Sequence, residues 1–438
     1  MRILVVGGGC REHIISERLR SEGNSIVSVM RNKNPGIARI SSALALREEN
    51  EVAGTVDFAV ENGADFAVIG PEGPLAAGLP DALQKRGIKC FGPTLGAAEI
   101  ETSKAFARRL MEKYGIPGNP GYAVFEHYAD AAGFIDNCAY DVVVKPSGLT
   151  GGKGVRIVGE QLGDNADAKI YVKELLGGKG ASVVIEERLI GEEFSLQAVT
   201  DGRKMVAFPL AQDHKRAFEG DRGPNTGGMG SYTAGNMLLP FVSEADRENA
   251  MYITQRVLSA LSSEDRMFRG LIYGNFMVTA EGVRLLEFNA RFADPEAMNV
   301  LSVTEGNLTE TLASAAEGNV KNMLNFENVS TVCRYFVPSG YGDKPVSGSE
   351  IRIEEEGVRS SGVMLYFGSV NAEGGRLLTT ASRSFALLAK GDEPWEAAGK
   401  IENASRFVSG PVYSRRDIGT KEEMERKRMI GEKLHGRI

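Results

Sequence analysis

The 438-residue chain has few cysteines, and their arrangement excludes two kinds of structural support. Cys10, Cys90, Cys138 and Cys333 are scattered and lack Cys-x-x-Cys spacing. Neither a zinc site nor a disulfide framework is therefore expected. The pattern fits a reducing compartment, and we expect a cytoplasmic protein.

Long apolar runs and an excess of positive charge are also missing. The first apolar run, Ile3–Val6, ends in glycines and is far too short for a signal peptide or a membrane span. The formal net charge of −7 gives no reason to expect binding to nucleic acid or to a membrane. With 42% hydrophobic and 25% charged residues, the chain is long enough for two to four packed domains.

The most informative segment, residues 141–158, reads DVVVKPSGLTGGKGVRIV. Two runs rich in β-branched residues flank a loop with four glycines around Lys153, which predicts a β-hairpin whose tip can approach a phosphate closely. A purely structural turn is the alternative. A Walker A loop is excluded, because Ser147 stands at its first Gly position, Gly154 replaces its hydroxyl residue and a strand follows.

A second segment, residues 282–296, reads GVRLLEFNARFADPE. Strand alternation places Glu287, Asn289 and Arg291 on one face, about 7 Å apart in succession, with Leu286 and Phe288 on the other. A carboxylate and an amide oxygen suit Mg²⁺, which takes its other ligands from nucleotide phosphates and water. The alternative is a half-exposed strand with ordinary solvated charges.

The first hundred residues alternate short strands with helical stretches, which predicts an open parallel sheet with helices on both faces. The expected strands are 2–6, 25–30, 66–69 and 89–91, and the expected helices include 11–21 and 80–87. Gly7-Gly8-Gly9 follows the first strand, as phosphate-binding turns do. Glu12 occupies the third Gly position of a dinucleotide fingerprint, so a sugar monophosphate is the better candidate ligand.

The rest of the chain divides into four further regions. We expect a linker helix at about 102–114 within residues 102–120, a flap lobe at 121–188, a metal and substrate lobe at 189–325, and a small, mostly β C-terminal domain at 326–438. Residues 211–233 have little apolar periodicity, and we interpret them as a substrate-binding loop in preference to a disordered excursion. A structural role is expected for His214.

Together, the flap and the Glu-x-Asn strand resemble the ATP-grasp superfamily. Further motifs narrow the resemblance to the phosphoribosylamine–glycine ligase (glycinamide ribonucleotide synthetase) family, and they run in family order over almost the whole chain. These motifs are GGGCREH (7–13), GPEGPL (70–75), FGPT (91–94), SKAF (103–106), EERLIGEE (186–193), QDHKR (212–216), GPNTGGMG (223–230), EFNARFADPE (287–296) and YSRRDIG (413–419).

The resemblance implies an α/β and α+β multidomain fold: an N-terminal open parallel sheet, a two-lobed ATP-grasp core and a small C-terminal domain. The implied activity is ATP-dependent ligation of glycine to 5-phosphoribosylamine through glycyl phosphate, in de novo purine biosynthesis. ATP and Mg²⁺ (or Mn²⁺) are the implied cofactors. Only small-molecule partners are expected, and the chain is expected to be a monomer.

The resemblance also assigns roles to residues. For ATP it implies Lys104, Lys145, Gly151, Gly152, Lys153, Gly154, Glu186, Glu187, Leu189 and Glu193. For the other substrates it implies Gly9, Glu72, Asp213, Lys215, Asn225, Thr226, Gly227, Gly228, Arg291 and Asp294, with Asp213 or Asp294 on the glycine ammonium. The metal ligands would be Glu287 and Asn289, and the catalytic residues Arg291, Lys145 and Asp213. Taken alone, a helical lysine such as Lys104 is usually just solvated, and an exposed loop charge is the alternative for Glu193.

Two other functions are compatible with parts of this pattern. Another ATP-grasp acyl-phosphate ligase or carboxylase acting on a purine precursor would share the flap and the metal strand but lack the QDHKR and GPNTGGMG motifs. A nucleotide-binding regulatory protein without turnover would be expected to lose a phosphate-binding lysine or a metal ligand. This chain retains Lys104, Lys145, Glu287 and Asn289.

Overall fold

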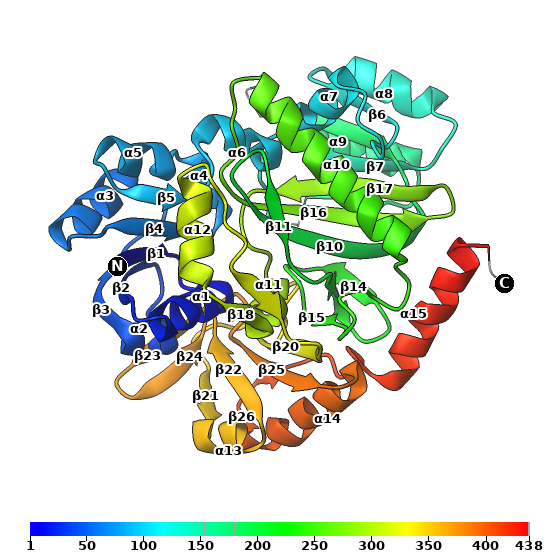
Figure 1. The fold of residues 1–438 in the computed structure, drawn as a ribbon. Helices are drawn as coiled ribbons and strands as arrows, with labels where there is room; N and C mark the ends of the chain where they lie inside the picture. The colour runs from blue at the N-terminus through cyan, green and yellow to red at the C-terminus, as the bar shows by residue number, and fades with distance from the viewer. Residues whose placement is uncertain (152–153, 179, 437–438) are drawn as a thin grey trace.

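The N-terminal region is a five-stranded parallel sheet with helices packed around it (Figure 1). The structure is a computed structural model that describes residues 1–151, 154–178 and 180–436. In strand order the sheet is β3 (Ser41–Leu46), β2 (Ser25–Met30), β1 (Arg2–Val6), β4 (Phe66–Ile69) and β5 (Lys89–Phe91). Its helices are α1 (Cys10–Ser21), α2 (Pro35–Ile40), α3 (Val52–Glu61), α4 (Glu72–Ala76) and α5 (Leu79–Lys85).

The predicted parallel sheet is therefore confirmed, with one additional strand. β3 has the sequence SSALAL and lies at the sheet edge, where no residue is fully buried. Serine and alanine have little preference for strands, so its local sequence gives no strand signal.

Two helices connect this sheet to the next region, where one was predicted at 102–114. α6 (Leu95–Thr102) ends and α7 (Lys104–Lys113) begins around Ser103. The Ser103 hydroxyl accepts a hydrogen bond of 3.1 Å from the amide of Phe106, which caps α7. The extended backbone of Ser103 breaks what the sequence presents as one helix.

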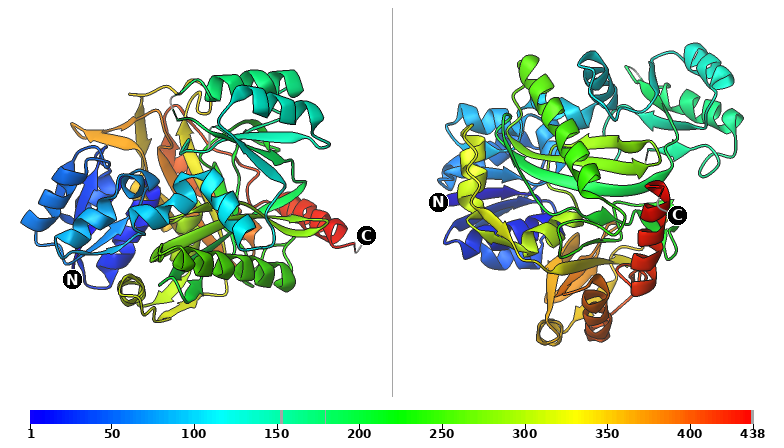
Figure 2. Two further views of the ribbon diagram at one scale, coloured as in Figure 1. Left: turned by 90° about the horizontal axis from the view of Figure 1, so that it is seen from above. Right: turned by 45° about the vertical axis from the view of Figure 1, so that its right-hand side comes forward.

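The flap lobe stands apart from the rest of the molecule in the right-hand view of Figure 2. Its antiparallel sheet has the order β6 (Tyr122–Phe125), β9 (Val183–Glu187), β7 (Val142–Pro146) and β8 (Arg156–Ile157), and α8 (Tyr128–Asn137) and α9 (Asn165–Leu175) pack on it. Val143 pairs with Ile157, which confirms the predicted hairpin. The lobe has its own hydrophobic core, separate from the main core of the described chain.

The region at 189–325, which contains the predicted metal-binding strand and is named the metal-strand lobe, is built on a second antiparallel sheet. Its order is β11 (Met205–Ala207), β10 (Gly191–Thr200), β16 (Gly270–Thr279) and β17 (Gly282–Asn289), and α10 (Glu244–Ser263) packs against it. Asn275 pairs with Glu287 whereas Phe276 pairs with Leu285, so Leu286 forms a bulge. The predicted alternation of side chains between two faces therefore fails here. Leu286 and Phe288 line the same cavity as Glu287, and Arg291 lies beyond the end of the strand.

Residues 211–233 form short strands, not an irregular loop. They are β12 (Gln212–Asp213), β13 (Arg216–Phe218), β14 (Arg222–Asn225) and β15 (Gly230–Thr233), with β13 and β14 paired as a hairpin. Each of these strands is only two to four residues long, which is too short for a periodicity analysis to detect.

A sheet of the order β12-β15-β20-β25-β22, with β27 beside β20, joins this segment to the C-terminal region. It therefore crosses the division expected at residues 325–326. The strands are β20 (Ser330–Pro338), β22 (Val363–Phe367), β25 (Phe385–Gly391) and β27 (Val412–Tyr413). The remaining elements are α11 (Glu296–Ser302), β18 (Thr304–Gly306), α12 (Leu308–Ala316), β19 (Leu324–Phe326), β21 (Glu350–Ile353), α13 (Glu355–Ser360), β23 (Val370–Glu373), β24 (Arg376–Thr379), α14 (Pro394–Ala404), the 3₁₀ turn Ser405–Phe407, β26 (Val408–Ser409) and α15 (Lys421–Leu434).

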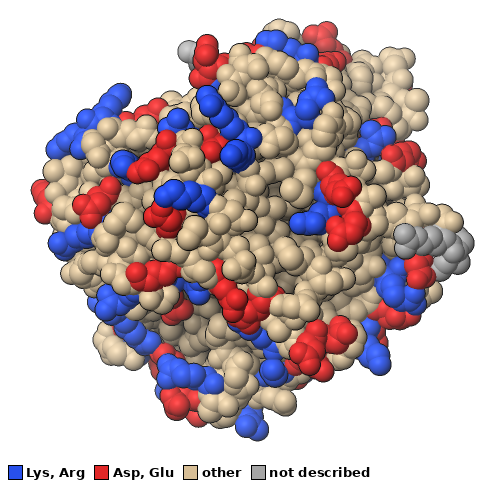
Figure 3. Space-filling view, in the orientation of Figure 1, with Lys and Arg blue, Asp and Glu red and all other residues tan. Residues whose placement is uncertain are grey.

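Two surface properties complete the description. On the face seen in Figure 3, basic and acidic side chains are interspersed and neither sign forms a continuous patch. Within residues 1–151, 154–178 and 180–436, no helix has the length and apolar character needed to cross a membrane.

Candidate active site

A cavity of about 550 Å³ lies where the N-terminal sheet, the flap lobe and the metal-strand lobe meet. Most of the predicted site residues line it. They are Gly9, Glu72, Lys104, Lys145, Gly151, Glu186, Glu187, Leu189, Glu193, Asp213, Lys215, Asn225, Thr226, Gly227, Glu287, Asn289, Arg291 and Asp294. Gly154 and Gly228 are not among the lining residues, and Gly152 and Lys153 lie outside the described residues.

Lys145 is held in the cavity by a buried carboxylate. Its Nζ lies 2.6 Å from Glu186 Oε2, and the Arg108 guanidinium contacts the same carboxylate by two bonds of 2.7 and 2.9 Å. Although burial alone would raise it, the pKa of Glu186 is lowered to about 2 by Arg108 and Lys145. Glu186 therefore stays ionised and fixes the lysine, a role the sequence did not indicate. Arg108, inside α7, was missed because a helical arginine carries no distinguishing signal.

Lys104 occupies the first turn of α7, beside the base of the flap. Its Nζ donates to the carbonyl of Gly148 at 3.2 Å, and its backbone amide donates to the carbonyl of Ser147 at 2.9 Å. Burial is the main cause that lowers the pKa of Lys104. Ser147, which breaks the Walker A pattern, thus connects the flap to the helix that carries the second phosphate-binding candidate.

Glu287 and Asn289 present oxygen atoms to the same cavity from β17. The Glu287 carboxylate makes no hydrogen bond or ion pair with any residue that the structure describes, while Asn289 Oδ1 accepts from Arg291 Nη2 at 3.2 Å. Among the described residues there is no cluster of three or more His, Cys, Asp or Glu that could hold a metal. A carboxylate with unused lone pairs and a neighbouring amide oxygen therefore fit a Mg²⁺ ion whose other ligands come from nucleotide and water.

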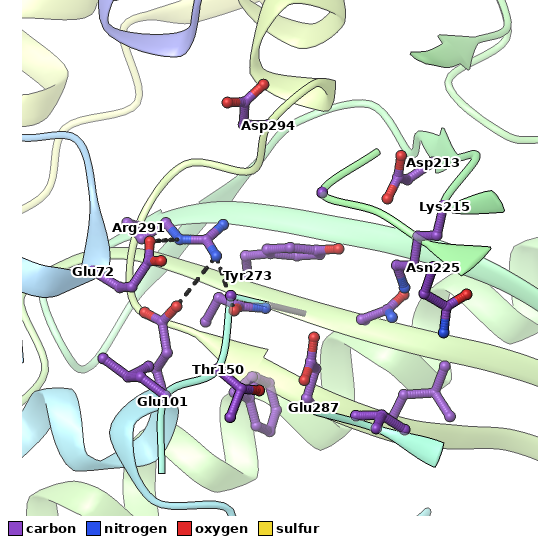
Figure 4. Close-up of a pocket in the computed structure, with 18 of the residues that line it drawn as sticks. Glu72, Glu101, Thr150, Asp213, Lys215, Asn225, Tyr273, Glu287, Arg291 and Asp294 are labelled. Atoms are coloured by element: carbon purple, nitrogen blue, oxygen red, sulfur yellow. Dashed lines mark hydrogen bonds and ion pairs between the residues drawn. The ribbon is translucent and has the colours of Figure 1, made fainter. Parts of the chain in front are cut away.

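Arg291 lies between two carboxylates of the N-terminal region (Figure 4). Its Nε is 3.3 Å from Glu72 Oε2, and its Nη2 is 3.3 Å from Glu101 Oε1. Arg291 lowers the pKa of Glu72 to about 2, whereas burial raises the pKa of Glu101 to about 7. The difference follows from exposure, because the Glu72 side chain is 30% exposed and that of Glu101 only 4%. Glu101 was missed for the same reason as Arg108.

Asp213 and Asp294 differ in their partners, which the sequence could not show. Asp294 accepts hydrogen bonds from Tyr335 at 2.5 Å and from Arg383 at 2.8 Å. Asp213 Oδ1 is buried, with no hydrogen-bond donor among the described residues.

The backbone of Gly228 runs close to the Asp213 carboxylate, so that a Cβ there would lie 2.5 Å from Asp213 Oδ1. Burial, followed by repulsion from Glu296, raises the pKa of Asp213, and burial also raises that of Glu296. Glu296 accepts from the Tyr273 hydroxyl at 3.2 Å, and both residues line the cavity. Neither carboxyl forms an ion pair with a described residue, although the charge of Lys215 partly offsets the rise in the pKa of both. Such a pair of acidic groups has the chemistry to accept a small ammonium group.

Beyond Asp213 in the QDHKR motif, Lys215 Nζ lies 2.5 Å from Glu193 Oε2, which also accepts from Asn275 Nδ2 at 3.1 Å. Figure 4 shows Asp213, Lys215 and Asn225 together at one side of the cavity, opposite Glu72 and Glu101. At the N-terminal side, the amide of Gly9 donates to Glu12 Oε2 at 2.7 Å. The start of α1 is therefore occupied by its own carboxylate, and the sugar monophosphate expected at this loop stays a prediction.

Comparisons with known proteins place this site in a family. Family models described as the N domain, the ATP-grasp (A) domain and the C domain of phosphoribosylglycinamide synthetase match residues 1–101, 102–297 and 331–421. The chain belongs to the phosphoribosylamine–glycine ligase family. A phosphoribosylamine–glycine ligase from Methanothermobacter thermautotrophicus is 48% identical over 432 residues, which is 98% of each chain. One from Pyrococcus furiosus is 44% identical over 436 residues, covering 100% of this chain and 98% of the other.

Solved structures agree with this placement. The phosphoribosylamine–glycine ligase of Thermotoga maritima superposes with a TM-score of 0.81 at 27% identity, over 95% of this chain and 100% of that one. A biotin carboxylase from Campylobacter jejuni gives a TM-score of 0.75 at 14% identity, over 97% and 95% of the two chains, and shares the fold alone. The predicted family, fold class and enzyme class, an ATP-dependent ligase, are confirmed.

Proposed function

We propose that this member of the phosphoribosylamine–glycine ligase family joins glycine to 5-phosphoribosylamine at the expense of ATP, giving glycinamide ribonucleotide, ADP and phosphate. The observation that carries the proposal is the division of the cavity. One part gathers Lys104, Lys145 and the flap beside the oxygen ligands of Glu287 and Asn289, and another combines Arg291 with Asp213, whose Oδ1 is buried and unpaired among the described residues.

In the nucleotide part, Lys104 and Lys145 would neutralise phosphate charge while Glu193 accepts from the ribose hydroxyls. Glu186, Glu187 and Leu189 line the cavity at the strand end where adenine would lie. Glu287 and Asn289 would hold Mg²⁺ or Mn²⁺. When bound, the ion would neutralise charge on the transferring phosphoryl group.

Glycine would bind between Asp213 and Arg291. The Asp213 and Glu296 carboxyls would share its ammonium group, and Arg291 would bind its carboxylate. Asp294 is a poorer choice for the ammonium because Arg383 already neutralises its charge and Tyr335 donates a hydrogen bond to it. In the structure Arg291 is paired with Glu72, so the glycine carboxylate would take the place of that partly exposed side chain, while buried Glu101 keeps its contact.

The chemistry requires two displacements. A carboxylate oxygen of glycine attacks the γ-phosphorus of ATP, the bond to the β,γ-bridging oxygen breaks, and ADP leaves. The amine of phosphoribosylamine then attacks the acyl carbon of glycyl phosphate, the carbon–oxygen bond breaks, and phosphate leaves with loss of one proton from nitrogen. Preorganised positive charge supplies most of the catalysis, and no side-chain nucleophile is needed.

Phosphoribosylamine would enter from the N-terminal side, past Gly9 and Glu72. Arg31, Asn32 and Arg383 line that end of the cavity and offer donors to a sugar phosphate. The division into domains at 1–101, 102–120, 121–188, 189–325 and 326–438 is part of the proposal. The separate core of the flap lobe supports the unit at 121–188, whereas the sheet that pairs β15 with β20 runs across the boundary at 325–326. All four cysteines are free thiols, which supports a cytoplasmic location. A monomeric state stays a prediction that light scattering can test.

Release of ADP and phosphate from ATP, measured with each substrate omitted in turn, tests the proposal. Release should require both glycine and phosphoribosylamine. If bicarbonate or another carboxylic acid replaces glycine, the chain is a different acyl-phosphate ligase or a carboxylase. If ATP binds and no combination of these substrates gives turnover, a regulatory protein is the better reading.

A further inference from the structure

Successive side chains of the QDHKR motif point to opposite sides of the backbone, and only those on one side line the cavity. Asp213 and Lys215 line the cavity, while Gln212 and His214 do not. Gln212 and His214 are nonetheless buried, with 3% of each residue exposed. Their polar groups face residues of β10 and of α15, the helix at 421–434.

Two buried charged residues of α15 make these contacts. Glu423 pairs with His214 Nε2 and accepts the Gly419 amide at 2.8 Å. Lys427 pairs with Glu192, and the same Glu192 oxygen accepts from Gln212 Nε2 at 3.1 Å.

The chain of contacts ends at the nucleotide side. Gln212 Oε1 accepts from the Tyr232 hydroxyl at 2.9 Å on β15, and Gln212 Nε2 also donates to the Glu193 carbonyl at 3.0 Å. Glu193 is the residue proposed for ribose, and it is bonded to Lys215 in the cavity. α15 is therefore linked by polar contacts to Gln212 and His214, the two neighbours of Asp213 in the chain.

Anchoring of the helix does not require these charges. Met424 is buried in the main hydrophobic core, and Gly431 lies so close to Phe241 that a Cβ there would be 2.5 Å from its Cα. Buried lysine and glutamate are rare unless paired, and a well-packed apolar pair is often as stable. Orienting the QDHKR segment explains the presence of Glu423 and Lys427 better than attaching α15 to the core does.

The neighbouring YSRRDIG motif reaches the same segment. The Arg415 side chain is completely buried and is bonded to Asp417 at 2.9 and 2.6 Å and to Asp221 at 3.0 Å. Arg415 also donates to the Arg216 carbonyl at 3.0 Å, at the start of the hairpin β13–β14. The segment 212–225 is thus contacted, both at its beginning and at its hairpin, by residues that do not line the cavity.

We propose that Glu423 and Lys427 of α15 are positioning residues for the glycine site, acting through His214, Glu192 and Gln212 on Asp213 and Lys215. The proposal rests on the proposed function for its substrate. It assigns to the C-terminal helix a part in catalysis although none of its residues touches the cavity. Most of this helix lies beyond the match to the family's C domain, which ends at residue 421.

Kinetics of Lys427→Met and Glu423→Gln in the full chain test the proposal, with the exposed Lys433→Met and Glu425→Gln on the same helix as matched controls. For both buried variants we expect the KM for glycine to rise about tenfold while the KM for ATP changes less than about twofold, because Gln212 bonds Glu193 only at its backbone carbonyl, in a strand that is also held by β16. Lys427→Arg should restore most of the glycine affinity. If glycine and ATP constants shift equally, or neither shifts, the positioning role is wrong.

Hydrogen exchange without substrates separates this inference from the proposed function. Amides of residues 212–216 should exchange faster in Lys427→Met than in the Lys433→Met control, while those of the flap lobe stay unchanged. Should Lys427→Met not fold, Glu192→Gln removes the same ion pair from β10 and should give the same pattern. Unchanged exchange at 212–216 overturns the positioning role. Absence of glycine-dependent turnover in the unaltered chain, with the exchange effect present, overturns only the proposed function.

Discussion

Arg291 shows how one charged side chain can hold two neighbours in different protonation states. Glu72 and Glu101 are both 3.3 Å from its guanidinium, yet the pKa of the first is lowered to about 2 and that of the second raised to about 7. Burial of Glu101 and repulsion from Glu72 outweigh the attraction of the arginine. The carboxylate that can leave for substrate is therefore the one that stays ionised.

Arg291→Lys should raise the KM for glycine or lower kcat strongly while changing ATP affinity only a few-fold. Lysine keeps the charge but loses the planar fork that bonds a carboxylate twice, a difference of about 1–3 kcal/mol. Steady-state kinetics and nucleotide titration measure the two effects separately. A rise in the ATP Kd in step with the loss of activity would place Arg291 in the triphosphate site.

Glu287→Gln should abolish synthesis and weaken binding of Mg²⁺ with nucleotide, while metal-free ATP binding is largely kept. The change removes one charge from the metal site and almost no volume. Calorimetric titration of the metal in the presence of nucleotide is the measurement. Unaltered metal affinity would contradict the assignment.

Glu101→Gln should flatten part of the pH dependence of stability. The folded pKa of about 7 lies above the ordinary value of 4.5, so the stabilisation from protonated Glu101 is complete below about pH 4.5 and lost as pH rises through 7. The melting temperature of the unaltered chain should therefore fall relative to that of Glu101→Gln by on the order of 2 °C between pH 5 and pH 8. A constant difference across this range would show that Glu101 is ionised throughout.

For single residues, the sequence predicted which side chains belong to the site better than it predicted their hydrogen-bond and ion-pair partners. Lys145, Glu287 and Asn289 lie in motifs whose residue types indicate phosphate and metal binding, and the structure brings them into one cavity. The choice between Asp213 and Asp294 depends on Arg383 and Tyr335, which are remote in sequence. Partners that meet only through tertiary folding leave no local pattern.

Among the elements, the flap hairpin and the segment 211–233 show what periodicity can and cannot predict. The hairpin β7–β8 was predicted because β-branched runs flank its glycines. The short strands β12 to β15 were not, since pairing across the sheet and not local preference makes them strands. The bulge at Leu286 likewise depends on the register with β16.

Nucleotide should protect the flap. Phosphate would supply contacts to backbone amides near the tip, so hydrogen exchange at residues 148–151 and 154–157 should slow when ATP and Mg²⁺ are added. ADP with Mg²⁺ should protect less, and the helices of the flap lobe provide an internal reference. Equal exchange with and without nucleotide would contradict the flap role.

The whole molecule has two separate hydrophobic cores among its described residues. The smaller one lies entirely within the flap lobe, and the larger joins the N-terminal, metal-strand and C-terminal regions. Small cores give low stability, so the flap lobe is expected to unfold first.

Calorimetry without nucleotide should therefore show two unfolding transitions, the first from the flap lobe. Saturating ATP binds both lobes and should raise the first transition towards the second, by about 2.7 kcal/mol of stabilisation at a hundredfold excess over Kd. Leu162→Ala, in the small core, should lower only the first transition. A single transition unaffected in shape by Leu162→Ala would show that the lobes unfold together.

Strand β15 pairs with β20, which follows it by about a hundred residues. At a synthesis rate of about 5–20 residues per second, the growing chain spends several seconds or more with that edge of β15 unmatched. An unmatched edge can bind any passing extended segment. Fragments that stop before residue 330 should therefore aggregate on the ribosome or in extracts.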